Sequence, residues 1–323
     1  MTEPNVRRLG RSGLAVSAAG LGCNNLGRPQ TATETLEGSQ AVVDAALDAG
    51  ITLFDVADIY GTPPGRSEEL LGVCLGKRRP GIVVATKFGM DTHGANGPDF
   101  NARGSRRYVR TAVEASLRRL RTDWIDLYQL HQPDPFTPID ETLAALDELV
   151  VAGKVRYIGH SNFSGWQLAD ADWAARTAHR TPFVSAQNEY SLLRREIERD
   201  LVPAAEHFGI GILPFFPLAN GLLTGKYTRA GAPSRSRLTD IKPQLLESAP
   251  WDQLERLQKF ADERGVGMLD VAFGWLLSRP QVSSVIAGAT SPEQVRANAT
   301  AALAFRPDIA DLAEIDAIFP PPV

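Results

Sequence analysis

Four ionisable residues with complementary chemistry stand at or near the ends of short apolar runs. The stretch FDVADIYG contains Asp55 and Tyr60, Lys87 ends the run IVVATK, and His131 ends IDLYQLH. A tyrosine hydroxyl has an ordinary pKa of about 10, and it donates a proton more readily beside a cation that favours its ionised form. Lys87 could be that cation, and Asp55 would keep the lysine charged. His131 could orient a carbonyl oxygen while Tyr60 supplies the proton, so the set predicts proton transfer to a carbonyl group.

Each of these residues also has an ordinary structural explanation when it is taken alone. Asp55 could cap a strand, Tyr60 could be an aromatic at the rim, Lys87 a surface charge and His131 a core histidine. The four residues can act in one reaction only if the fold brings the ends of the three strands together.

The pattern along the chain predicts such a fold. Short apolar runs alternate with segments of helical periodicity, which is typical of βα units around a parallel sheet. Strands are expected at 18–22, 51–55, 82–87, 125–131, 155–161, 183–189, 211–215 and 284–289. Helical patterns lie at 39–50, 67–76, 108–120, 139–153, 166–178, 199–209 and 292–303. Eight repeats predict an α/β fold of the closed (β/α)8 TIM-barrel type, one domain over 1–323, with a doubly wound open sheet as the alternative.

Further segments complete the expected architecture. Residues 6–18 predict a hairpin that turns at 11–13 and lies across the bottom of the barrel, and 308–319 predict an extra C-terminal helix. The segments 89–107 and 218–250 exceed ordinary loop length, which indicates either function or disorder. In a barrel the strand ends share one mouth, so the four ionisable residues would converge there.

Composition narrows the class of partner. The 323 residues are 43% hydrophobic and 22% charged, with a net charge of -4 and scattered Lys and Arg, so we expect a small-molecule ligand and neither nucleic acid nor a membrane. Cys23 and Cys74 belong to no CxxC pattern, which predicts reduced thiols and a cytoplasmic location. A metal-dependent hydrolase lacks support because no two of the five histidines form an HxH or HxxxH pair. Nothing in the sequence predicts an oligomeric state.

The sequence offers one candidate anion site. No GxGxxG follows the first expected strand, so a Rossmann nucleotide site is unsupported. After the eighth strand, GATSPEQ places Ser291 as a helix N-cap, Pro292 as the first helical residue and Glu293 in the first turn. A helix N-terminus at this position commonly binds phosphate in barrels, although an ordinary capped helix explains the segment equally well.

The chain resembles the aldo-keto reductases over nearly its whole length. The motifs GITLFDVADIYG, RSEELLG, VVATKFG, IDLYQLHQPD, GKVRYIGHSNFS, QNEYSLL, PLANGLLTGKY and GATSPEQVRAN occur in the order and spacing of that family. Within it, the similarity is greatest to bacterial reductases and potassium-channel β subunits. The resemblance implies a barrel that binds NADP(H) and reduces aldehydes or ketones. Asp55, Tyr60, Lys87 and His131 would then be the catalytic tetrad, with Tyr60 as general acid.

The resemblance also implies a set of cofactor contacts. Ser161, Asn162 and Gln187 would hydrogen-bond the nicotinamide carboxamide, and Phe215 would stack on its ring. The loop over the phosphates would supply Leu218, Lys226 and Arg237, with Arg235 as the alternative to Arg237. The adenosine end would contact Gly288, Thr290, Gln294 and Asn298.

Two alternatives remain beside the NADP(H)-dependent enzyme. Gly288 and Gln294 stand where some relatives carry a Lys and an Arg for the 2′-phosphate, so NAD(H) remains an alternative to NADP(H). The second alternative is an NADP(H)-sensing regulatory subunit with little turnover, like the channel β subunits. The retained His131 and the lack of a long N-terminal arm favour the enzyme. His160 replaces a residue that is often small or apolar in relatives, and no function is assigned to it.

Overall fold

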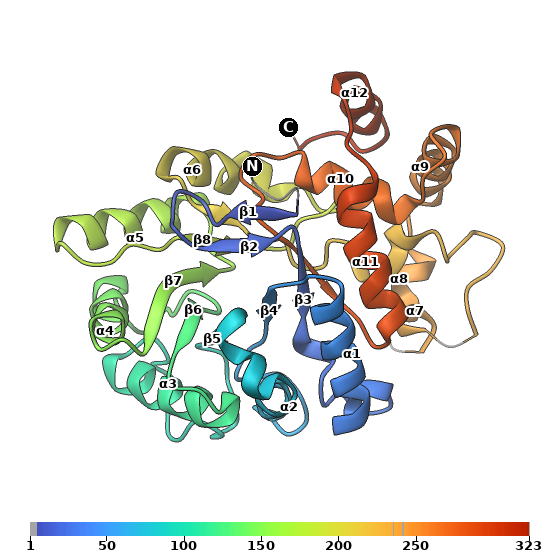
Figure 1. Cartoon of the computed structure of the whole chain (residues 1–323). Coiled ribbons are helices and arrows are strands. Elements are labelled where there is room, and N and C mark those ends of the chain that lie inside the picture. The colour runs from blue at the N-terminus through green and yellow to red at the C-terminus, as the bar shows by residue number, and fades with distance from the viewer. Residues whose placement is uncertain (1–4, 235, 241, 323) are drawn as a thin grey trace.

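A closed barrel of parallel strands forms the centre of the molecule (Figure 1). The computed structural model describes residues 5–234, 236–240 and 242–322, and of Arg237 and Asp240 it describes the backbone alone. Within these residues, eight parallel strands form one sheet in the order β10, β3, β4, β5, β6, β7, β8, β9. They are β3 (Ala19–Gly22), β4 (Leu53–Asp55), β5 (Val83–Phe88), β6 (Ile125–Leu130), β7 (Val155–Ser161), β8 (Ser185–Gln187), β9 (Gly211–Ile212) and β10 (Val285–Gly288).

Hydrogen bonds between the two ends of this strand order close the barrel. The Ile212 amide donates to the Gln281 carbonyl over 2.7 Å, and the Ile286 amide donates to the Pro214 carbonyl over 3.1 Å. Ile212 also forms a parallel bridge with Val282. The predicted (β/α)8 barrel is therefore confirmed, and the open-sheet alternative is wrong because such a sheet would leave both edges unpaired.

A hairpin covers the N-terminal end of the barrel, as the sequence predicts. Strands β1 (Val6–Arg8) and β2 (Ala15–Ser17) pair antiparallel and lie across the barrel in Figure 1. The turn between them needs a glycine, since Gly10 has a φ of +58° and a Cβ there would lie 2.3 Å from the Gly209 carbonyl oxygen. Leu9 and Val16 of the hairpin pack on apolar residues inside the barrel, which are Leu53, Ala85, Leu127, Leu213 and Ile286.

Helices surround the barrel on its outer face. The expected ones are α1 (Leu36–Asp48), α2 (Arg66–Leu75), α3 (Arg106–Leu120), α4 (Ile139–Val151), α5 (Gly165–Thr177), α6 (Leu201–Phe208), α11 (Pro292–Ala304) and the extra C-terminal α12 (Ile309–Ile318). Short 3-10 segments are η1 (Cys23–Asn25), η2 (Ala32–Glu34), η3 (Gly76–Gly81), η4 (Glu196–Arg199) and η5 (Ala219–Thr224). No helix in the described part of the chain is long and apolar enough to cross a membrane.

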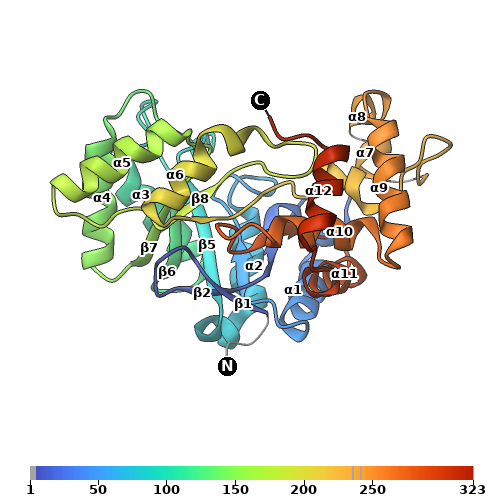
Figure 2. The same cartoon turned by 90° about the horizontal axis from the view of Figure 1, so that it is seen from above.

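Four helices were not anticipated from the sequence. They are α7 (Arg237–Asp240), α8 (Pro243–Glu247), α9 (Trp251–Glu263) and α10 (Met268–Leu277), of which α7, α8 and α9 lie together at one side in Figure 2. The signal for α9 was present, because Leu254, Leu257 and Phe260 recur at helical spacing and are buried. Most of α10 is buried, so its sequence shows no polar face by which to recognise a helix.

Candidate functional site

The four ionisable residues meet at the C-terminal end of the barrel. Asp55 ends β4, Lys87 lies one residue before the end of β5, His131 directly follows β6, and Tyr60 lies in the loop between β4 and α2. Side chains alternate along β5, so Ala85 packs inside the barrel and Lys87 points the same way, nearer the mouth. The barrel thus brings residues from three neighbouring strands together, as predicted.

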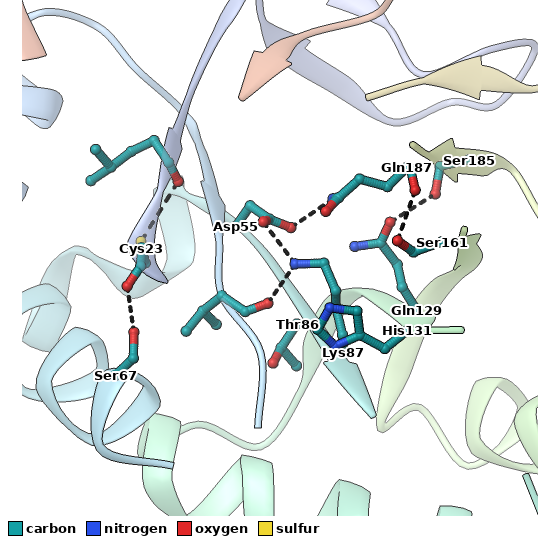
Figure 3. A network of polar contacts seen from close by, with 12 residues as sticks. Cys23, Asp55, Ser67, Thr86, Lys87, Gln129, His131, Ser161, Ser185 and Gln187 are labelled. Carbon is teal, nitrogen blue, oxygen red and sulfur yellow. Dashed lines mark hydrogen bonds and ion pairs between the residues drawn. The ribbon is translucent and has the colours of Figure 1, made fainter. Parts of the chain in front are cut away.

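Lys87 and Asp55 form a buried ion pair, drawn in Figure 3. The lysine Nζ lies 2.7 Å from Asp55 Oδ2 and donates a second hydrogen bond of 3.0 Å to the Val56 carbonyl. Burial alone would lower the pKa of Lys87, but the charge of Asp55 and contact with Tyr60 outweigh burial and raise it. Lys87 is therefore a positively charged ammonium at neutral pH.

Tyr60 lies beside this ammonium. Its ring centroid is 5.0 Å from Lys87 Nζ and 5.8 Å from the His131 ring centroid, with the two rings edge to face. The pKa of Tyr60 is raised, because burial and the Asp55 charge outweigh the opposing effect of Lys87. Lys87 acts on the Tyr60 pKa in the expected direction, but burial has the larger effect. Tyr60 consequently keeps its proton at neutral pH.

His131 is held as a neutral imidazole. Burial, with a smaller effect of Lys87, places its pKa well below the ordinary value. Its backbone carbonyl accepts a 3.0 Å hydrogen bond from Asn162 Nδ2, while its ring atom Nδ1 is buried without a partner among the described residues. A neutral imidazole can donate one hydrogen bond to an oxygen acceptor.

The residues predicted to bind a carboxamide form one hydrogen-bonded group. Ser161 Oγ donates to the Gln187 carbonyl over 2.7 Å, and Asn162 Nδ2 lies 3.0 Å from Ser161 Oγ. Gln187 Nε2 donates to Asp55 Oδ1 over 2.8 Å, a contact that was not foreseen from the sequence (Figure 3). Gln187 therefore supports the Asp55 carboxylate as well as facing the cavity.

A cavity of about 920 Å³ connects these groups with the end of β10. Of the residues singled out from the sequence, it is lined by Asp55, Tyr60, His131, Ser161, Asn162, Gln187, Phe215, Leu218, Lys226, Gly288, Thr290, Gln294 and Asn298. Lys87 is fully buried behind this wall. The side chain of Arg237 and the whole of Arg235 lie outside the part of the chain that the structure describes.

The far end of the cavity contains the predicted helix N-terminus. Ser291 caps α11, its Oγ accepting a 3.4 Å hydrogen bond from the Gln294 amide, and Pro292 begins the helix. Gln294 Oε1 accepts from the Thr290 amide over 2.8 Å. The cap assigned from the sequence is confirmed.

A polar turn at this end of the cavity was not foreseen from the sequence. Asn24, Asn25 and Arg28 follow β3 and line the cavity. They stand at the end of a strand, so the rule that selected Asp55 and His131 would also have selected them. Of the long segment 89–107, Met90 lines the cavity.

A second polar network lies behind Tyr60. Asn96 Nδ2 donates to Asp58 Oδ2 over 2.7 Å, and Arg119 donates to Asn96 Oδ1 over 2.9 Å and to Glu68 Oε2 over 2.7 Å. Thr86, next to Lys87 on β5, bonds the other Glu68 oxygen over 2.5 Å. The network joins α2, α3 and the segment 89–107 to the loop that carries Tyr60.

Comparison with known proteins identifies the family. A profile described as "Aldo/keto reductase family" matches residues 19–319. The chain is 39% identical over 295 residues to "uncharacterized oxidoreductase YrpG" of Bacillus subtilis (strain 168), covering 89% of this chain and 88% of that protein. It is 34% identical over 323 residues to "L-glyceraldehyde 3-phosphate reductase" of Escherichia coli (strain K12), covering 96% and 91%. It is 35% identical over 303 residues to "probable voltage-gated potassium channel subunit beta" of Arabidopsis thaliana, covering 90% and 89%. The chain therefore belongs to the aldo/keto reductase family.

Proposed function

We propose that the protein is an NADP(H)-dependent oxidoreductase that reduces aldehydes or ketones to alcohols, with Asp55, Tyr60, Lys87 and His131 as its catalytic residues. The observation that carries the proposal is the pairing of a buried, charged Lys87 with a protonated Tyr60 at one end of a large cavity. Family membership and the similarity to proteins named as reductases support the reaction class.

The residues present fit a nicotinamide dinucleotide. The cavity volume is near the upper end of the range for small-molecule sites. One end offers the amide and hydroxyl groups of Ser161, Asn162 and Gln187, beside the aromatic Phe215. Lys226 supplies a cation along the cavity, and the N-terminus of α11 lies at the other end. Amides near a carboxamide and cations near phosphates are the donor types that such a cofactor requires.

The chemistry divides between the cofactor and the side chains. When bound, NADPH supplies the hydride that reduces the carbonyl carbon. Tyr60 Oη donates its proton to the carbonyl oxygen, and the ammonium of Lys87 stabilises the tyrosinate that remains. Asp55 and Gln187 hold Lys87 in place, and neutral His131 donates a hydrogen bond that orients the carbonyl oxygen.

Burial and charge explain how Tyr60 can keep its proton before the reaction and release it during the reaction. Tyr60 has a raised pKa before reaction, so it enters the reaction protonated. Loss of the proton creates a negative charge beside the fully buried ammonium of Lys87, where the attraction between opposite charges is strong. In the oxidation direction, the same tyrosinate would accept the proton of the alcohol.

The proposal also covers the domain organisation, the location and the partners of the protein. We place residues 1–323 in one barrel domain that acts in the cytoplasm on a small aldehyde or ketone, without nucleic acid or membrane as a partner. Cys23 and Cys74 are both free and buried, which fits a reducing compartment.

A second candidate is a nucleotide-sensing regulatory subunit with little turnover. The similarity to a protein named as a potassium channel subunit favours it. The presence of all four proton-transfer residues in one site favours the enzyme instead.

One experiment separates the two. The purified protein is titrated with NADPH and with NADH by calorimetry, and NADPH oxidation is then followed with short-chain, dicarbonyl and aromatic aldehydes. Tight NADPH binding with turnover supports the reductase. Tight binding without turnover on any aldehyde supports the sensor, and binding of neither nucleotide rejects both.

A further inference from the structure

Arg28 lies at the end of the cavity where β10 meets α11. It follows η1 in the turn after β3 and lines the cavity. Its Nη1 donates to Asn25 Oδ1 over 3.2 Å, and Asn25 Nδ2 donates to the Ala289 carbonyl over 3.2 Å. One side-chain amide therefore connects the guanidinium with the residue between Gly288 and Thr290.

The turn that carries Arg28 is firmly held. Asn25 is only 7% exposed, its carbonyl accepts a 2.7 Å hydrogen bond from Thr33 Oγ1, and Thr31 Oγ1 donates to the Arg28 carbonyl over 2.8 Å. The Thr62 amide donates to the Gly27 carbonyl over 3.2 Å, which ties the turn to the loop after Tyr60. The guanidinium is consequently presented from a fixed backbone.

The charge of Arg28 is not compensated within its surroundings. Among the described residues its side-chain partner is the neutral amide of Asn25, and no carboxylate pairs with it. The residues that line the cavity include two cations, Arg28 and Lys226, and one acid, Asp55, whose charge Lys87 neutralises. The cavity is therefore electrostatically suited to an anion at positions away from Asp55.

Gly288 lies against the turn that carries Arg28. A Cβ at Gly288 would lie 3.0 Å from Asn25 Nδ2 and 3.2 Å from Asn24 Oδ1. The side chains of Asn24 and Asn25 thus lie close to the position that a Cβ at residue 288 would take. A side chain at position 288 would therefore press on the two amide side chains of the turn that brings Arg28 to this corner.

We propose that Arg28 binds the 2′-phosphate of the nucleotide and thereby selects NADPH over NADH. The inference rests on the proposed function, because it assigns one residue to the cofactor of that reaction. A guanidinium presents paired donors that match phosphate oxygens, so Arg28 would recognise a group that NADH lacks.

Calorimetry with two adenosine fragments tests the assignment without turnover. Adenosine 2′,5′-bisphosphate and adenosine 5′-monophosphate differ by the 2′-phosphate alone. The wild-type protein is expected to bind the bisphosphate more tightly. Arg28→Ala should weaken bisphosphate binding by about tenfold or more and change monophosphate binding by less than about twofold, the size expected for losing one charged hydrogen-bonding contact. NADPH and NADH titrations should give the same pattern.

Two further variants sharpen the test. Arg296→Ala removes the same charge from an exposed position on α11 that pairs with Glu293 and does not line the cavity, so it should leave both affinities unchanged. Arg28→Lys retains a cation without the planar donor pair and should recover part of the preference.

Each other outcome counts against the inference. Equal weakening of both fragments by Arg28→Ala would place Arg28 on the shared part of the nucleotide, and no weakening would remove it from the site. Either result would overturn the inference and leave the proposed function standing. Failure of the wild-type protein to bind NADPH or NADH would reject both.

Discussion

Gln187 Nε2 donates a 2.8 Å hydrogen bond to Asp55 Oδ1 across the barrel. The two residues end β8 and β4, which are four strands apart in the closed eight-stranded order and so lie on opposite sides. Lys87 takes the other carboxylate oxygen over 2.7 Å. The Asp55 carboxylate is thus fixed from two directions, and it in turn fixes the ammonium beside Tyr60.

Replacement of Gln187 by leucine should destabilise the protein. The change removes a hydrogen bond to a buried ionised carboxylate, so the free energy of unfolding should fall by about 1.5–3 kcal/mol. Urea denaturation measures the effect. Gln244→Leu on the exposed face of α8 is the matched control and should change stability little. Equal stability of the Gln187→Leu and Gln244→Leu proteins would mean that the hydrogen bond to Asp55 contributes nothing.

Removal of the Lys87 charge should be more damaging than removal of the whole ion pair. Lys87→Met leaves Asp55 buried and unpaired, and the expected loss of unfolding free energy is about 3–5 kcal/mol. The double variant Asp55→Asn/Lys87→Met removes both charges and should recover a large part of that loss. Both variants should lack turnover. A double variant no more stable than Lys87→Met would contradict this account of the pair.

Asp58 should make the stability of the folded protein fall as the pH rises. Burial, with the nearby Glu68, raises the pKa of Asp58 well above its ordinary value, while Arg119 and Asn96 oppose this only in part. The folded protein therefore holds the Asp58 proton at a pH where the unfolded chain releases it. Stability is favoured at low pH and is lost as pH rises toward the folded-state pKa.

Asp58→Asn tests this directly, because an amide of similar shape does not titrate. The variant should gain stability relative to wild type as the pH is raised from about 4 to about 8. Unfolding curves at both pH values measure the difference. A gain that is largest at the lower pH would have the wrong sign for a raised pKa.

His160 should make the protein sensitive to mild acid. Its ring is fully buried between Phe163 and Phe183, both nitrogens lack partners among the described residues, and burial lowers its pKa from 6.5 to about 3. The unfolded chain takes up the proton first, so stability falls as pH drops from 6.5 toward 3.

The unfolded chain takes up one more proton than the folded protein, so the free energy of unfolding should fall by about 1.4 kcal/mol per pH unit. Between pH 6.5 and about pH 5 the wild-type protein should therefore lose about 2 kcal/mol more than His160→Leu. His207→Leu, at an exposed position, should follow the wild-type curve. Parallel curves for wild type and His160→Leu would exclude His160 as the source.

The sequence was informative wherever a local rule applied. Strand ends of a barrel converge, so Asp55, Lys87 and His131 could be grouped without a structure, and the Ser291 cap could be assigned from its spacing. The contact between Gln187 and Asp55 could not, because it joins residues 132 positions apart through a barrel diameter that no local pattern encodes. The sign of the Tyr60 pKa shift depended on the balance of burial against Lys87, which required the packed site.

Other features that were not predicted from the sequence have different physical causes. The buried helix α10 lacks the polar face by which helices are recognised, whereas α9 and the Asn24–Asn25 turn carried signals that were missed. The network through Asn96 and Arg119 links segments that only the fold brings together.

The most direct test of the central claim is the kcat of Tyr60→Phe with NADPH and an aldehyde that the wild-type protein reduces, together with NADPH affinity by calorimetry. Tyr128→Phe, which removes a buried hydroxyl without a described partner, is the matched control and should keep its activity. If Tyr60 is the general acid, kcat of Tyr60→Phe should fall by at least about 100-fold, with NADPH affinity changed by less than about twofold. A Tyr60→Phe protein that binds NADPH and turns over at the wild-type rate would contradict the account.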